Sequence, residues 1–146
     1  MLVADTGAVL ALLDRDDRHH QAVRAIFEAN PGGWILPWAI LPEVDYLAST
    51  RLGQRAHRLW LDDLAEAALS VEWGRDDDLA GAHALIARYA SLEMGLVDAL
   101  VMVTAERLDA DIATLDLQHF GAVALKHAPR LLPRDAGVSP ARSRRR

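Results

Sequence analysis

The sequence predicts an α/β fold, a three-layer α/β/α sandwich around a mostly parallel sheet of about five strands. Short apolar runs alternate with helix-length amphipathic segments, which is the pattern of parallel strands covered by helices on both faces. The 146 residues are the common size of one domain, and 51% hydrophobic with 25% charged residues is the balance of an ordinary globular protein. No internal repeat interrupts this pattern.

In the first half of the chain, turn and capping residues divide the apolar runs into elements. Asp5-Thr6-Gly7 closes the first run, and Asn30-Pro31-Gly32-Gly33 stops a helix that Asp16 or Asp17 can cap. Pro42 is tolerated in the first turn of a helix. The expected elements are a strand at residues 1–4, a short helix at 8–13, a helix from 16 or 17 to about 29, a strand at 34–36, and helices at 42–53 and 55–68.

The second half continues the alternation. Asp76, Asp77 and Asp78 precede a helical pattern, and their charges suit the positive end of a helix dipole. The expected elements are a strand at residues 69–73, a helix from 76 to about 89, a helix at 96–108, a strand at 112–114 and a last strand at 122–125. Residues 134–146 are rich in Arg, Ser, Pro and Gly, so we expect a domain of residues 1–133 followed by a flexible tail.

Composition excludes several classes of protein. The chain has no cysteine, which excludes disulfides, thiol nucleophiles, iron–sulfur clusters and cysteine-ligated zinc, and fits a reducing cytoplasm, the expected location. The longest uncharged stretch, residues 29–42, is broken by proline and glycine and is shorter than the roughly 20 residues that span a bilayer. The N-terminus lacks the basic region and apolar core of a signal peptide.

Charge is unevenly distributed along the chain. The formal net charge is −5, yet residues 134–146 hold five arginines against one acid, Asp135. An acidic main body argues against broad binding to phosphate backbones by bulk charge. It leaves open a local site where carboxylates hold a cation and the cation meets a phosphate.

Four acidic residues stand where an α/β sheet gathers its functional groups. Asp5 follows the first strand, and Asp116 follows the strand at residues 112–114. Glu43 and Asp98 lie in the first turns of helices. Because the carboxyl ends of parallel strands and the starts of the following helices meet at one edge, we expect these four carboxylates to converge.

Each of these acids also has a purely structural interpretation. Asp5 can shape a turn and Asp116 can form an Asx-turn. Glu43 can complement a helix dipole and Asp98 can cap a helix. Apolar neighbours favour the functional interpretation, because Asp98 stands within the run Gly95–Val103, where a carboxylate is costly unless it is paired or bound to a cation. A divalent metal is the common remedy for repulsion among four carboxylates.

These acids belong to motifs that occur in a fixed order. The motifs are Val3-Ala4-Asp5-Thr6-Gly7, Pro42-Glu43-Val44, Gly95-Leu96-Val97-Asp98-Ala99-Leu100, and Ile112-Ala113-Thr114-Leu115-Asp116 with His119-Phe120. With them the chain resembles the PIN-domain ribonucleases, and within that family the VapC-type toxins of bacterial toxin–antitoxin pairs. The resemblance covers about residues 1–127, and the ordered set is more specific than any single motif.

The resemblance implies a metal-dependent endoribonuclease whose products carry a 5′-phosphate and a 3′-hydroxyl. In the family, the residues matching Asp5, Glu43, Asp98 and Asp116 form the acidic pocket that holds Mg²⁺ or Mn²⁺, and those matching Thr6 or Thr114 support it by hydrogen bonding. It also implies an RNA substrate, an antitoxin protein that blocks the pocket, and a homodimer or dimer of heterodimers. Hard oxygen ligands independently favour Mg²⁺ or Mn²⁺, and such an ion can activate water toward phosphorus.

A few other side chains invite a functional interpretation. His119 is near the predicted pocket and is interpreted as a helix-end histidine packing on Phe120, with substrate contact as the alternative. Trp34 and Trp73 lie in predicted strands and are expected in the core. Trp38 lies on a loop at the active rim and is the candidate for contact with RNA or a partner.

Three other functions were weighed against this one. Lys126 suits an aspartate phospho-receiver, but the third strand ends Glu72-Trp73-Gly74 without the aspartate that such a domain phosphorylates. A dinucleotide-binding domain is disfavoured because no G-x-G-x-x-G follows the first strand. The remaining alternative is a non-catalytic PIN-like protein-interaction module, in which the acidic pocket would be incidental.

Overall fold

A five-stranded parallel sheet lies at the centre of the protein, whose computed structural model describes residues 1–139. The spatial order is β3-β2-β1-β4-β5, and each neighbouring pair is parallel. This confirms the predicted fold class. The strands are β1 (Leu2–Ala4), β2 (Trp34–Pro37), β3 (Leu69–Glu72), β4 (Asp111–Ala113) and β5 (Leu131–Leu132).

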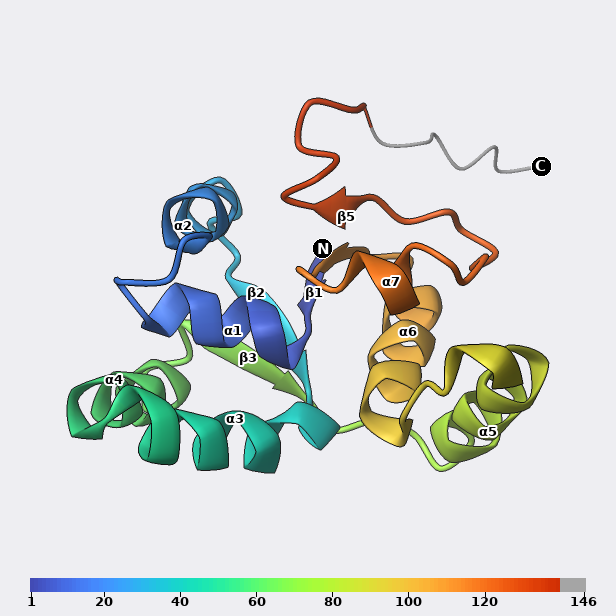
Figure 1. Cartoon of the computed structure of the whole chain (residues 1–146), viewed down its shortest axis with the longest axis horizontal. Helices are drawn as coiled ribbons and strands as arrows, with labels where there is room; N and C mark the ends of the chain where they lie inside the picture. The colour runs from blue at the N-terminus through green and yellow to red at the C-terminus, as the bar shows by residue number, and fades with distance from the viewer. Residues whose placement is uncertain (140–146) are drawn as a thin grey trace.

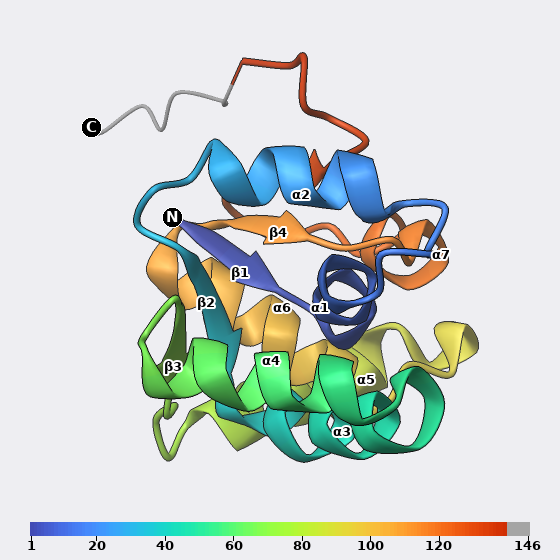
Figure 2. The same cartoon turned by 90° about the vertical axis from the view of Figure 1, so that its left-hand side faces the viewer.

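Helices cover both faces of the sheet. Helices α1, α2 and α4 lie on one side and α5 and α6 on the other (Figure 1), and a view from the left-hand side shows α1 and α4 in front of the strands with α6 behind them (Figure 2). The α-helices are α1 (Thr6–Leu13), α2 (His20–Glu28), α3 (Leu41–Leu47), α4 (Gln54–Ala65), α5 (Asp78–Arg88), α6 (Leu96–Leu108) and α7 (Leu117–Phe120). Three short elements join them, the 3-10 turns η1 (Trp38–Ile40) and η3 (Ala90–Leu92) and the π turn η2 (Ala48–Leu52).

The core lies between β1 and the helices packed on it. All three residues of β1 are buried, because a central parallel strand is covered on both faces. Helix α6 lies directly against the sheet, and its Ala99, Met102 and Ala105 are each fully buried. Helix α6 is covered by the sheet on one side and by α5 on another, so most of its surface is buried and it shows no clear division into a polar and an apolar side.

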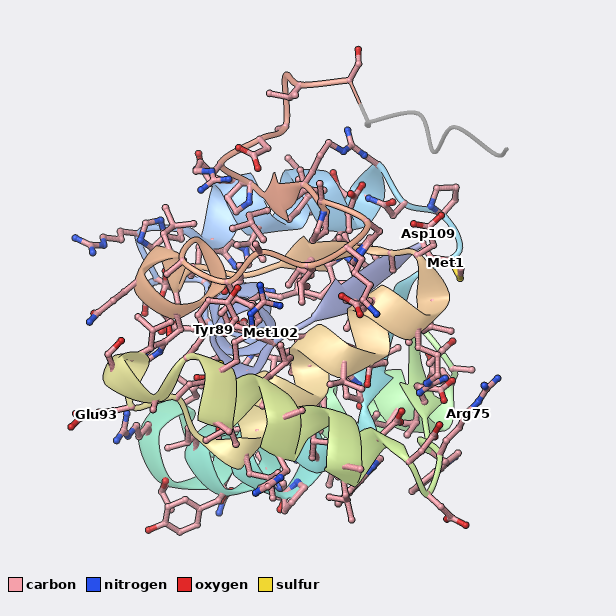
Figure 3. All side chains as sticks on the ribbon, turned by 90° about the vertical axis from the view of Figure 1, so that its right-hand side faces the viewer. Met1, Arg75, Tyr89, Glu93, Met102 and Asp109 are labelled. Carbon is pink, nitrogen blue, oxygen red and sulfur yellow. The ribbon has the colours of Figure 1, made fainter. Side chains whose placement is uncertain are left out.

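The strand order reverses at β1. From β1 the chain steps through β2 to β3 on one side, and then crosses to β4 and β5 on the other. In sheets of this class, functional groups gather outside the carboxyl ends of the strands at such a reversal. Figure 3 shows the α5–α6 face: Tyr89 and Glu93 mark the end where α6 begins, and Met1 and Asp109 mark the opposite end.

The last strand is displaced from its predicted position. Residues 122–125 form a loop rather than a strand, and β5 is Leu131–Leu132, paired with Ile112 and Ala113 of β4. In the loop, the amide of Ala124 donates to the hydroxyl of Tyr89 at 3.1 Å, so this backbone bonds to a side chain instead of a strand. The prediction was wrong because both segments are short and apolar, and only the pairing with β4 distinguishes them.

Two local predictions also need correction. Trp73 is 74% exposed rather than buried, because β3 ends at Glu72 on the edge of the sheet and Trp73 lies beyond it. Asp16 and Asp17 do not cap the second helix: α2 begins at His20, and the Asp17 carboxylate instead accepts a hydrogen bond from the amide of His19 at 2.7 Å. Trp34 is fully buried, as predicted.

The segment after β5 is attached to the sheet as far as it is described. The Asp135 carboxylate accepts from the amide of Leu131 at 2.8 Å, and Arg130 donates to the carbonyl of Val138 at 3.0 Å. The rest of the predicted tail, residues 140–146, lies outside the described residues. Within residues 1–139, every helix is too short or too polar to span a membrane.

Candidate active site

Asp5 is the buried centre of the candidate site. It follows β1 directly, and its amide continues the ladder by donating to the carbonyl of Ala113 at 3.0 Å. Its Oδ1 accepts from the amide of Ala8 at 2.8 Å, which makes Asp5 the N-cap of α1. Asp5 therefore has a structural role as a helix cap rather than in the turn that the sequence suggested, and this role holds the carboxylate at the point where the strand order reverses.

Thr114 joins the two aspartates that follow β1 and β4. Its hydroxyl donates to Oδ2 of Asp5 at 2.5 Å and accepts from the amide of Asp116 at 3.0 Å. The amide of Thr114 donates to the carbonyl of Leu132 in β5 at 3.0 Å, which fixes its own position. Thr114 is buried, and its hydroxyl tolerates burial because it both donates and accepts a hydrogen bond.

Asp98 and Asp116 face each other from different elements. Asp98 lies in the first turn of α6, where Gly95 rather than an acid is the N-cap. Asp116 is the N-cap of α7, and its Oδ1 accepts from the amide of His119 at 3.1 Å. Ligand atoms of Asp98, Asp116 and His119 all lie within 4.8 Å of one another. The structure thus brings together three acids that are far apart in the sequence, Asp5, Asp98 and Asp116.

The electrostatics of Asp5 show that this group of carboxylates repels negative charge. Burial raises the pKa of Asp5 to about 6, although its hydrogen bonds from Thr114 and Ala8 act in the opposite direction. The charges of Asp98 and Asp116 are smaller contributions to the same rise. A positive ion beside this carboxylate would stabilise its ionised form and lower its pKa.

Asp98 shows the same effect, and it connects Glu43 to the site. Burial raises the pKa of Asp98 above its ordinary value, and the charges of Asp116 and Glu43 add to the rise. His119 acts in the opposite direction. Glu43 lies in the first turn of α3, exposed to solvent, and its charge acts on Asp98 without a hydrogen bond between them in the described residues.

His119 is the residue whose importance the sequence analysis missed. Its Nδ1 lies 2.8 Å from Oδ2 of Asp116 and 3.5 Å from Oδ2 of Asp98, and its Nε2 lies 3.0 Å from the carbonyl oxygen of Leu92. The hydrogen bond to Asp116 raises the pKa of His119 above its ordinary value. The signal in the sequence was its spacing of three residues from Asp116, which places both side chains on the same side of one helical turn.

The two threonines predicted to support the pocket differ in their contacts. Thr114 makes the hydrogen bonds described above, whereas the buried hydroxyl of Thr6 has no hydrogen-bond partner within the described residues. Thr6 follows Asp5 at the first position of α1. Its hydroxyl is the orphaned buried polar atom beside the carboxylates, and an added ligand or water at the site is the natural partner for such a group.

The donor set suits a divalent cation. Asp5, Asp98 and Asp116 offer carboxylate oxygens at one edge of the sheet, and the charge of the exposed Glu43 acts on Asp98. Burial, with a smaller contribution from mutual repulsion, raises the pKa of Asp5 and of Asp98. Oxygen ligands in this number are typical of Mg²⁺ and Mn²⁺ sites. The chemistry of such a site is the polarisation of a bound phosphate and of water.

The chain matches a known protein family over most of its length. The family model of the PIN domain matches residues 2–126. Ribonuclease VapC26 of Mycobacterium tuberculosis is 29% identical over 123 residues, which cover 84% of this chain and 91% of that protein.

Solved structures show the same fold at lower sequence identity. The M. tuberculosis toxin VapC20, described as cleaving the sarcin–ricin loop, superimposes with a TM-score of 0.73 at 18% identity, over 85% of this chain and 97% of that one. A toxin–antitoxin complex from Klebsiella pneumoniae gives a TM-score of 0.65 at 19% identity, and FitAcB from Neisseria gonorrhoeae gives 0.60 at 18%. Each of these two covers 84% of this chain and is itself covered to 92%.

Proposed function

This chain belongs to the PIN domain family, and we propose that it is a divalent-metal-dependent endoribonuclease of the VapC toxin type. The observation that carries the proposal is the convergence of Asp5, Asp98 and Asp116 at the reversal of strand order, with the charge of Glu43 acting on Asp98. The ribonuclease name of the M. tuberculosis relative supports the same chemistry.

The proposed role of the four-carboxylate site is to hold Mg²⁺ or Mn²⁺, with Asp5, Asp98 and Asp116 as the ligands. When bound, such an ion supplies positive charge for the scissile phosphate and lowers the pKa of water. The raised pKa values of Asp5 and Asp98 support this assignment, because both shifts come from burial and repulsion that a cation would offset. Thr114 supports the arrangement by fixing Asp5 and the start of α7 relative to each other.

The remaining acid is assigned a role in proton transfer. Glu43 stands at the exposed rim of the site, outside the cluster of Asp98, Asp116 and His119. Its carboxylate is available to orient the attacking water and to accept its proton. Water attacks phosphorus in line with the 3′-oxygen, and the P–O3′ bond breaks. The carboxylate accepts one proton of the water and the departing 3′-oxygen takes a proton from solvent, which leaves a 5′-phosphate and a 3′-hydroxyl.

We also assign the protein an antitoxin partner. One of the structures that share its fold is described as a toxin–antitoxin complex, from K. pneumoniae. In this proposal a small partner protein covers the carboxylate site until the toxin is released. Assembly as a homodimer or as a dimer of heterodimers belongs to the same proposal.

The test is cleavage of total cellular RNA by the purified protein, with Mg²⁺, with Mn²⁺ and with EDTA. Asp5→Asn and Asp98→Asn preparations serve as the inactive forms, and Asp63→Asn, which changes an acid of α4, serves as a matched control. We expect discrete fragments with 5′-phosphates that require the metal and are absent in the first two variants. Cleavage that persists in EDTA or in Asp98→Asn would overturn the proposal.

A folded, metal-loaded and partner-free protein that cuts nothing would favour the alternative, a non-catalytic interaction module. In that case Asp5→Asn would leave the effect of the protein on its host cell intact. The two outcomes are separated by comparing growth arrest on expression of the wild-type chain and of this variant.

A further inference from the structure

His119 has two contacts that fix the direction of its ring. The carbonyl oxygen of Leu92 can only accept a hydrogen bond, so Nε2, 3.0 Å away, carries the hydrogen. Nδ1 is then the ring atom directed at the carboxylates of Asp116 and Asp98, at 2.8 and 3.5 Å. Leu92 belongs to η3, a segment separate from α7, so the ring is held from both sides.

This arrangement is the one that metal-binding histidines adopt in proteins. Such a histidine usually donates its second ring N–H to a carboxylate or to a backbone carbonyl, which fixes the tautomer and the direction of the ligating nitrogen. Here the Leu92 carbonyl takes that position and Nδ1 faces two carboxylates. Ligands on one small divalent ion, each about 2.1 Å from it, lie about 3 to 4 Å apart, which the spacing of these groups permits.

We propose that His119 is itself a metal ligand, and that the site therefore prefers Mn²⁺ over Mg²⁺. The proposal rests on the proposed function only in placing a divalent ion among the carboxylates. An imidazole nitrogen adds affinity for a first-row transition ion and little for Mg²⁺, which binds oxygen and keeps its waters. The contact between Nδ1 and Asp116 is the one that the ion would replace.

The direct test is pulsed electron paramagnetic resonance of Mn²⁺ bound to the full-length protein. A coordinated imidazole gives nitrogen modulation in the echo envelope, and ¹⁵N-labelled histidine changes its frequencies. We expect the modulation in the wild-type protein and in His83→Ala, a matched change of an exposed histidine on α5. We expect it to disappear in His119→Ala and in His119→Asn, which retains a polar side chain if the alanine variant folds poorly.

Calorimetric titration supplies the second readout. His119→Ala should weaken Mn²⁺ binding at least about tenfold and Mg²⁺ binding by less than roughly threefold. Equal losses for the two ions would overturn the proposal, as would a wild-type protein without nitrogen modulation or a His119→Ala variant that keeps it.

The outcome is separable from that of the proposed function. Nitrogen modulation in a protein that cleaves no RNA would support His119 as a metal ligand and contradict the proposed nuclease activity. Metal-dependent cleavage without nitrogen modulation would support the nuclease activity and show that His119 is not a metal ligand.

Discussion

Helix α6 carries carboxylate clusters near both of its ends, and they differ in what neutralises them. Beyond its middle, Arg107 donates to both carboxylate oxygens of Asp78, at 3.1 and 3.0 Å, and to Glu72 at 3.0 Å. In its first turn, Asp98 faces Asp116 and Asp5, and the ring of His119 is the positive group 3.5 Å away. A guanidinium is permanently charged, whereas an imidazole exchanges its proton near neutral pH.

The difference separates a structural cluster from the cluster proposed as the metal site. The Arg107 cluster connects β3, α5 and α6 and is complete within the chain. The Asp98 cluster contains more negative charge than its own residues offset, and the proposed divalent ion would supply the missing positive charge. Buried carboxylates alone therefore do not identify the active site of this protein. The informative observation is whether a fixed cation from the chain accompanies them.

The largest effect on stability is expected when the structural cluster loses its cation. Arg107→Met leaves the carboxylate of Asp78 buried without a charge partner, and we expect the free energy of unfolding to fall by about 3 kcal/mol. Urea denaturation at pH 7 in EDTA measures this. Glu72→Gln is the milder control, because Asp78 keeps its pairing with Arg107. If the free energy of unfolding of Arg107→Met fell by less than about 1 kcal/mol, the Arg107 cluster would contribute no more than an exposed ion pair and would not be a structural cluster.

Metal should act on the Asp98 cluster alone. At a concentration of 100 times its dissociation constant, Mn²⁺ should raise the free energy of unfolding of the wild-type protein by about 2.7 kcal/mol. The gain should be absent in Asp98→Asn and retained in Glu72→Gln, as measured by denaturation with and without the ion. A similar gain in both variants would place the ion elsewhere on the molecule.

Asp5 predicts a pH dependence in the absence of metal. Its pKa is about 6 in the folded protein against 3.8 ordinarily, so folding favours the protonated acid. The stability that it contributes is complete below about pH 4 and is lost as the pH rises through 6. Asp5→Asn, which stays uncharged, should therefore be more stable than wild type at pH 7 by about 1–2 kcal/mol, after allowance for one altered hydrogen bond.

Denaturation curves at pH 4 and pH 7 in EDTA test this expectation. The advantage of Asp5→Asn should appear only at the higher pH. An advantage of equal size at both pH values would mean that ionisation of Asp5 is not its cause.

The smallest expected change in stability is that of Asp98→Asn, and the matching substitution in the Arg107 cluster is Asp78→Asn. In EDTA, Asp98→Asn removes like-charge repulsion from Asp116, and we expect a gain in stability of less than about 1 kcal/mol because Asp98 is partly solvated. Asp78→Asn should instead lower stability, because it breaks the pairing with Arg107. Parallel thermal melts measure the two changes, and changes of the same sign would remove the distinction between the clusters.

Local sequence signals were sufficient for the elements that place the acids. Apolar runs bounded by turn residues located β1, β2 and β4, and helix α6 begins and ends at the residues predicted for it, Leu96 and Leu108. The general rule for parallel sheets then predicted that Asp5, Glu43, Asp98 and Asp116 would converge, and Glu43 lies at the exposed rim rather than with the other three. The positions of these strands and of α6 could be predicted because each depends on a short segment of sequence and on a topology that most parallel α/β sheets share.

The parts that were missed depend on contacts between distant segments. The direction of His119 is set by the Leu92 carbonyl, 27 residues earlier. The position of β5 is set by its pairing with β4, and the exposure of Trp73 by the place of β3 at the sheet edge. Neither composition nor periodicity of a short segment contains this information.

The attachment of Thr114 to β5 sets a limit on where the chain can be shortened. The family match ends at residue 126, before Leu131–Leu132, so a deletion designed on that boundary would keep every acid of the site. It would also remove the carbonyl of Leu132 that holds the amide of Thr114, and with it the support of Asp5 and Asp116. A protein truncated there is expected to lose activity although all of its carboxylates are unchanged. A shortened form of this chain should therefore extend at least through Leu131–Leu132.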